Sequence, residues 1–224
     1  MGPVTTPTAG TPAPPKPLLR GVLHEVAAFV AAVAGAVLFF RASGARARIG
    51  ALVYVISLVT LLSVSAIYHR KTWSDRLRAV WRRLDHSAIF LLIAGTYTPF
   101  SFLLGSRTGW IFLGIVWGGA LLGIVMSIAW VKAPKALVAL VCVLLGWAAL
   151  PLLPALKAAL GTGAVVLLAT GGVVYSLGAA VYALRRPDPF PNVFGYHEIF
   201  HALVIAAAAC HFAVVARAVS ALST

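Results

Sequence analysis

Residues 195–217, GYHEIFHALVIAAAACHFAVVAR, decide the fold class of this chain. A bilayer hydrocarbon core about 30 Å thick is crossed by roughly 20 predominantly apolar residues in a helix. This stretch is long and apolar enough to cross once, and its basic residue, Arg217, stands at the far end. Three ionisable residues, His197, Glu198 and His201, lie in its first two turns. The stretch therefore indicates a transmembrane helix with a cluster of ionisable side chains where it enters the membrane.

The composition of the whole chain also indicates a membrane protein. The 224 residues are 61% hydrophobic and 10% charged, with a mean hydropathy of +0.97, whereas soluble domains carry about 25% charged residues. The balance of 18 Lys and Arg against 5 Asp and Glu would suggest nucleic-acid binding in a soluble protein. Here the basic residues lie between apolar runs, where they act as topological anchors. We expect a multi-pass protein of the plasma (inner) membrane that binds no nucleic acid.

Seven apolar runs are long enough to span the membrane, and they predict an all-α fold. The first 17 residues are rich in Pro, Thr and Gly, a composition typical of a disordered tail. We therefore predict a tail over residues 1–17 and a seven-transmembrane-helix bundle over residues 18–224. The basic segment 70–85 is expected to form an amphipathic turn of helix at the headgroups. The predicted spans are approximately 21–40, 49–69, 86–104, 109–130, 136–154, 162–184 and 195–217.

The positions of Lys and Arg predict how the bundle is oriented. With a cytoplasmic N-terminus, twelve of the 18 basic residues lie on the cytoplasmic side, which favours a C-terminus outside. The same topology brings eight of the eleven Asp, Glu and His residues to the cytoplasmic face. Ionisable groups at membrane depth usually face the bundle interior, so we expect a functional site there. The eight residues are His24, Glu25, His69, Asp85, His86, His197, Glu198 and His201.

The two histidines that open the last span have the spacing of metal ligands. His197 and His201 are one helical turn apart on one helix face. His69 ends the second span at the same depth, and three neutral imidazoles leave zinc an open position, as in catalytic sites. Asp85 could orient or deprotonate a water, and the Ser65 hydroxyl could bond a metal-bound group or a substrate oxygen. An intrahelical backbone bond is the alternative for Ser65.

Residues 197–201 also match the H-E-x-x-H pattern of zinc proteases, in which the glutamate is the general base. Glu198 would lie about 100° around the helix from His197, and Asp85 already faces the site from another span. We therefore favour H-x-x-x-H over an intramembrane protease. We expect Glu198 to bond a cationic loop residue or His24 instead.

These residues, in this order on seven spans, resemble a known family. Ser65-x-x-x-His69, Asp85 and His197-x-x-x-His201 are similar to the hemolysin III-like proteins, the bacterial branch of the progestin and adipoQ receptor (PAQR) family. PKPLLRGVLHE at 15–25 and AGTYTPF at 94–100 are similar as well. The resemblance implies a zinc site of the three histidines, with Asp85 linked through water, and an inside N-terminus. It also implies kinship with membrane metal-dependent hydrolases that include alkaline ceramidases.

The leading functional hypothesis is a zinc-dependent hydrolase of a lipid amide or ester, active in membrane homeostasis, with Asp85 and Ser65 as catalytic residues. Its partner would be a membrane lipid in the cytoplasmic leaflet. One alternative is a non-enzymatic membrane sensor or regulator in which zinc is structural. Another is a cytolysin, as the family's name suggests, although no span carries the continuous polar stripe of an aqueous channel.

Overall fold

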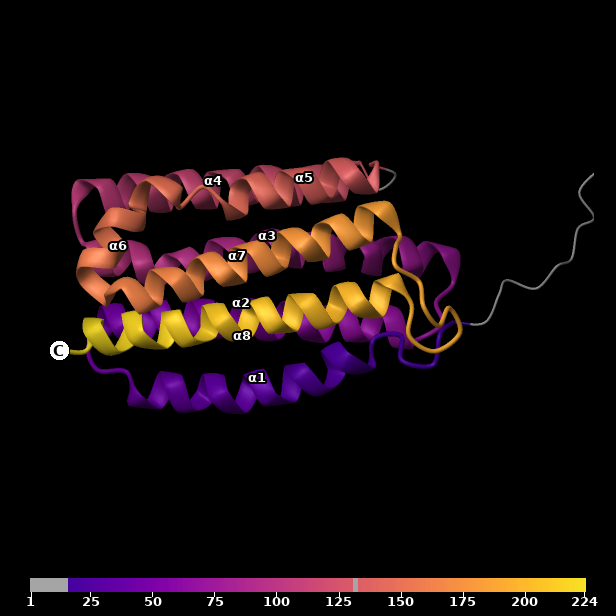
Figure 1. The fold of residues 1–224 in the computed structure, drawn as a ribbon, viewed down its shortest axis with the longest axis horizontal. Helices are drawn as coiled ribbons and strands as arrows, with labels where there is room; N and C mark the ends of the chain where they lie inside the picture. Colours follow the sequence, from indigo (N-terminus) through magenta and orange to yellow (C-terminus); the bar gives the residue numbers. More distant parts are fainter. Residues whose placement is uncertain (1–15, 131–132) are drawn as a thin grey trace, which may run out of the picture.

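A computed structural model describes residues 16–130 and 133–224 (Figure 1). Over these residues the chain is helical apart from its loops and an isolated β-bridge between Phe190 and Phe194. Seven helical segments are long and apolar enough to cross a membrane, which confirms the predicted all-α, seven-span fold for the described residues. The helices are α1 (Val22–Arg41), α2 (Ala45–Arg70), α3 (Asp75–Leu104), α4 (Arg107–Ala129), α5 (Lys135–Gly146), α6 (Leu153–Leu160), α7 (Thr162–Leu184) and α8 (Tyr196–Leu222).

Helices that follow one another in the chain pack side by side. α1 packs on α2, α2 on α3, α3 on α4, and α7 on α8. α8 also contacts α1, α2 and α3, so the last span closes the bundle against the first three. In Figure 1, α1 lies at one edge of the bundle, and α4 and α5 lie at the opposite edge. The residues that α2, α3 and α8 turn toward each other are therefore in the interior.

Two glycines allow α3 to lie very close to its neighbours. A Cβ atom added to Gly95 of α3 would fall 2.1 Å from the Oγ of Ser57 in α2. A Cβ atom added to Gly123 of α4 would fall 2.4 Å from the ring of Phe90 in α3. Helix interfaces in membranes use small residues for contacts of this kind. The packing holds α3, which carries Asp85, firmly against α2, which carries His69.

The third span begins earlier than the sequence predicts. α3 starts at Asp75 and runs unbroken to Leu104, so only residues 71–74 connect it to α2. No proline or glycine occurs between Asp75 and Ala94, and nothing in the sequence interrupts the helix there. Residues 75–85 of the basic segment are therefore helical, as the sequence predicts, but they form the first turns of α3 and not a separate element.

The fifth span bends near the prolines that the sequence places at its end. α5 ends at Gly146, and the chain continues through a 3-10 turn at Leu150–Leu152 into α6. Pro151 and Pro154 occupy first-turn positions of these two elements, where the missing N–H has no intrahelical partner to lose. Together, residues Ala136–Leu160 meet the length and hydropathy of one span.

The residues before α1 are attached to the loop between α7 and α8. The Leu18 amide donates to the carbonyl of Asn192 at 3.0 Å, and the Leu19 amide donates to the carbonyl of Val193 at 3.2 Å. Of the predicted tail, residues 1–17, all but Lys16 and Pro17 lie outside the described residues. We call the end of the bundle that carries this segment the site end. The C-terminus lies at the other end (Figure 1).

Candidate metal centre

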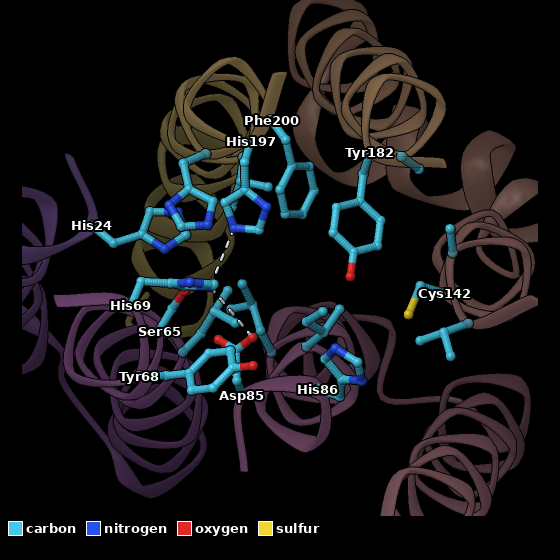
Figure 2. Close-up of a pocket in the computed structure, with 18 of the residues that line it drawn as sticks. His24, Ser65, Tyr68, His69, Asp85, His86, Cys142, Tyr182, His197 and Phe200 are labelled. Carbon is cyan, nitrogen blue, oxygen red and sulfur yellow. Dashed lines mark hydrogen bonds and ion pairs between the residues drawn. The ribbon is translucent and has the colours of Figure 1, made fainter. Parts of the chain in front are cut away.

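Helix ends and first turns bring the predicted residues together at the site end. His69 is the next-to-last residue of α2, and His197 and His201 lie in the first two turns of α8. Asp85 lies inside α3, ten residues after its start. Figure 2 shows the side chains of these helices pointing toward one another across the interior. The consecutive helices α2 and α3 and the distant helix α8 therefore form one polar cluster.

The three histidines form a compact group of ligand atoms, which we call the three-histidine group: His69, His197 and His201. The Nε2 atoms of His69 and His197 are 3.2 Å apart, and one ligand atom from each of the three residues lies within 4.8 Å of the others. Ligands at 2.0–2.1 Å from a tetrahedral zinc ion are about 3.3 Å apart. His197 and His201 are buried, and neutral imidazole suits zinc among the divalent metals. The donor set and its spacing fit a metal ion.

Asp85 and Ser65 lie beside this group. The Asp85 Oδ2 atom is 3.9 Å from the Nε2 atom of His69, and the Ser65 hydroxyl is close enough to interact with the Asp85 carboxylate. Both side chains are largely shielded from solvent. Ser65 thus lies beside a carboxylate, whereas the sequence left open a metal-bound group, a substrate oxygen or a backbone carbonyl as its partner.

His24 joins the cluster in a way that its position in the sequence does not reveal. Its ring stacks on that of His201, with centroids 3.8 Å apart and planes 2° from parallel. Both residues are 2% exposed. The sequence predicted His24 at the depth of the site. Its stacking on His201 could not be predicted, because it depends on the rotation of α1 about the helix axis. His86, predicted in the same cluster, lines the neighbouring cavity and is not part of the three-histidine group.

Glu198 bonds a cationic residue, as the sequence predicts. The Arg20 Nε atom, in the segment before α1, lies 2.5 Å from Glu198 Oε1. The other carboxylate oxygen, Oε2, accepts a 2.9 Å hydrogen bond from the amide of Gly195 and caps α8. Both oxygens are therefore engaged by groups outside the three-histidine group. The geometry favours H-x-x-x-H over the protease pattern.

A cavity of about 650 Å³ adjoins the cluster. Such a volume is in the usual range for small-molecule sites, about 300–1,000 Å³. The cavity begins among charged residues at the site end and continues between α3, α5, α7 and α8 to Trp147 and Tyr175. The Tyr182 hydroxyl points into it (Figure 2). Its inner walls are mainly apolar, with Leu92, Ile93, Val138, Val143, Phe200 and Val204 among the lining residues.

Comparisons with known proteins identify the family of this chain. A family profile described as "Haemolysin-III related" matches residues 13–212. Hemolysin-3 of Bacillus cereus is 32% identical over 199 residues, which cover 87% of this chain and 88% of the relative. The hemolysin-3 homolog of Bacillus subtilis (strain 168) is 36% identical over 163 residues, 71% of this chain and 72% of the relative.

A more distant similarity extends to a eukaryotic receptor. The adiponectin receptor protein of Drosophila melanogaster is 30% identical over 178 residues, which cover 71% of this chain and 40% of the receptor. The family match covers the seven spans almost completely and includes all three histidines. This chain is a multi-pass plasma-membrane protein and belongs to the hemolysin III family, with the PAQR-type receptors among its relatives.

Proposed function

We propose that this protein is a zinc-dependent hydrolase of a lipid amide or ester. The observation that carries the proposal is the position of three clustered imidazoles in the wall of an apolar cavity that begins at the charged end of the bundle. A lipid can place its acyl chain among the apolar walls and its carbonyl beside the three-histidine group. The charge distribution supports a cytoplasmic site end, and hence a substrate from the cytoplasmic leaflet.

His69, His197 and His201 would hold the zinc. When bound, zinc supplies a Lewis acid for the carbonyl and makes a water molecule more acidic. The carboxylate of Asp85 is the base that accepts a proton at Oδ2, the oxygen nearest His69. The Ser65 hydroxyl, which lies beside this carboxylate, would donate to it and hold its orientation. Asp85 then returns the proton to the leaving amine or alcohol.

The walls of the cavity exclude water and position the substrate. Val138, Val143 and Phe200 offer apolar contacts to an acyl chain. The Tyr182 hydroxyl points toward the cavity from α7 (Figure 2) and can donate to a polar group of the substrate.

A membrane sensor or regulator with a structural zinc is the second candidate. The supporting observation is that the three ligands come from only two helices, α2 and α8, which are distant in the chain. A metal ion there would join the second and last spans and stabilise the closed bundle.

The test combines metal analysis with lipid turnover. Purified protein is expected to hold one zinc per chain, and His197→Ala and His201→Ala are expected to lose it. His211→Gln is the matched control, because this histidine lies on the same helix and bonds the carbonyl of Leu168. Lipid extracts incubated with the protein should release free fatty acid. Absence of zinc, or its full retention in both alanine variants, would refute the proposal.

Asp85→Asn separates the two candidates. An enzyme should lose turnover and keep its zinc and its fold, because asparagine preserves the shape of the side chain but accepts no proton. A structural site has no turnover to lose, so a wild-type protein that holds zinc and releases no fatty acid supports the sensor.

A further inference from the structure

Four basic side chains line the cavity at the site end. Lys16 and Arg20 come from the segment before α1, and Arg78 and Arg82 come from the first turns of α3. We call these four residues the cationic mouth. The acidic residues that line the same cavity are Asp75 and Asp85.

The charges of the cationic mouth are only partly compensated. Arg20 is paired with the buried Glu198, and the Lys16 ammonium donates to the backbone carbonyls of His69 and Lys71. Neither Arg78 nor Arg82 forms an ion pair with a residue that the structure describes. The pKa of Lys16 is lowered, first by partial burial and then by repulsion from Arg78 and Arg20. Positive charge therefore accumulates at this end of the cavity, where Asp75 and Asp85 are the acidic lining residues.

Membrane topology alone does not explain this arrangement. The positive-inside rule requires basic residues at this end but not inside a cavity. Arg76, Arg185 and Arg186 lie at the same end and do not line the cavity, whereas Lys16 and Arg78, although exposed, do line it. The four residues of the cationic mouth differ from the other basic residues at this end because they line the cavity.

The cationic mouth adjoins the candidate metal centre. The Lys16 Nζ atom is 3.3 Å from the carbonyl oxygen of His69, whose imidazole belongs to the three-histidine group. In a phospholipid the phosphate is a few bonds from the acyl carbonyl. A lipid with its carbonyl at the three-histidine group therefore carries its phosphate toward these cations. Guanidinium groups bind phosphate oxygens through paired, charge-assisted hydrogen bonds.

We propose that the cationic mouth binds the phosphate of a phospholipid whose acyl carbonyl reaches the three-histidine group. The substrate class would then be phosphate-bearing lipids and not neutral lipid amides or diacylglycerols. This inference rests on the proposed function for the placement of the carbonyl, while phosphate binding itself requires no turnover.

The test measures binding in detergent micelles by fluorescence anisotropy. The probes are a fluorescent phosphatidylglycerol and a fluorescent diacylglycerol with the same acyl chains. Wild-type protein is expected to bind the phosphatidylglycerol at least tenfold more tightly. Arg78→Gln/Arg82→Gln should remove most of that preference, whereas Arg185→Gln/Arg186→Gln, with the same change of charge outside the cavity, should retain it. Equal binding of the two probes by wild-type protein, or equal losses in the two double variants, would overturn the proposal.

Two further measurements distinguish binding of a lipid phosphate from a loss of folding and from binding of a free anion. Zinc content and thermal stability of the Arg78→Gln/Arg82→Gln variant should match wild type; if they fall with the binding, the loss is one of folding and the proposal fails. Inorganic phosphate should displace the labelled lipid only at concentrations at least a hundredfold above those of unlabelled phosphatidylglycerol. Displacement by both at equal concentrations would assign the site to a free anion and overturn the lipid proposal. Failure of the proposed function would instead show as absence of zinc with phosphate-dependent binding intact.

Discussion

The ion pair between Arg20 and Glu198 allows a quantitative test of the site end. The Glu198 side chain is 1% exposed and the Arg20 side chain is 22% exposed. Arg20→Ala leaves a buried carboxylate with the Gly195 amide as its remaining partner. Removing one partner of a buried pair costs about 3–5 kcal/mol, because the other charge stays uncompensated. We expect the free energy of unfolding to fall by that amount.

Glu198→Gln should cost less than Arg20→Ala. The glutamine oxygen can still accept the Gly195 amide, and the partly exposed guanidinium can turn toward water. A loss of about 1–3 kcal/mol is expected, the range for breaking a hydrogen bond to a buried group. The double variant Arg20→Ala/Glu198→Gln removes both charges and should be more stable than Arg20→Ala alone, which gives a coupling energy between the two sites.

The assay is unfolding by SDS titration in mixed micelles, followed by fluorescence of the six tryptophans. The ion pair between Arg70 and Glu25, 2.9 Å long and about half exposed on both sides, is the matched control. Arg70→Ala should cost at most about 1 kcal/mol, as is usual for exposed pairs. A stabilising buried ion pair would be refuted if Arg20→Ala cost no more than Arg70→Ala, or if the losses at Arg20 and Glu198 were additive. Glu198→Gln should also keep its zinc and its turnover, because this carboxylate does not face the three-histidine group.

Substitutions at three other positions test individual contacts. Asp85→Asn should lower the rate of lipid hydrolysis by about 10²–10⁴-fold, the usual contribution of a general base, and leave zinc content unchanged; a rate within threefold of wild type would rule out Asp85 as the base. His24→Phe should preserve the ring stacked on His201 and keep zinc affinity within about threefold of wild type. His24→Ala should weaken zinc affinity about 10–100-fold, as for other residues that orient ligands. Equal zinc affinities of wild type and His24→Ala, measured by competition titration with a chelator, would exclude an orienting role. Gly123→Leu should destabilise the bundle by about 1–3 kcal/mol or more, because the new side chain meets the ring of Phe90, and an unchanged SDS-unfolding midpoint would contradict the α3–α4 packing.

Hydropathy and length predicted the number of spans because each must bury its own backbone hydrogen bonds in lipid. The predicted range 162–184 coincides with α7. The start of α3 was predicted too late, since its first turns are basic and amphipathic and do not register as membrane-spanning. Hydropathy detects only the apolar part of α3, whereas the helix itself also includes the basic residues before that part.

The meeting of His69, His197 and His201 could be predicted because depth in the membrane and helical spacing restrict where side chains can meet. The link from Glu198 to a cation was also predicted, although its partner, Arg20, was not identified. The stacking of His24 and the cationic mouth depend on helix rotation and on a segment that folds back over the bundle. Neither leaves a periodic signal in the sequence.

The contacts of residues 16–20 extend the site end beyond the seven membrane spans, because this segment pairs with Glu198 and lines the cavity. A chain shortened to begin at Lys16 would keep every contact described for this segment. A chain shortened to begin at Val22 would retain each complete helix but lose the partner of Glu198 and two of the four mouth cations. An affinity handle for purification is therefore better attached after Thr224, at the end of the bundle remote from the histidines.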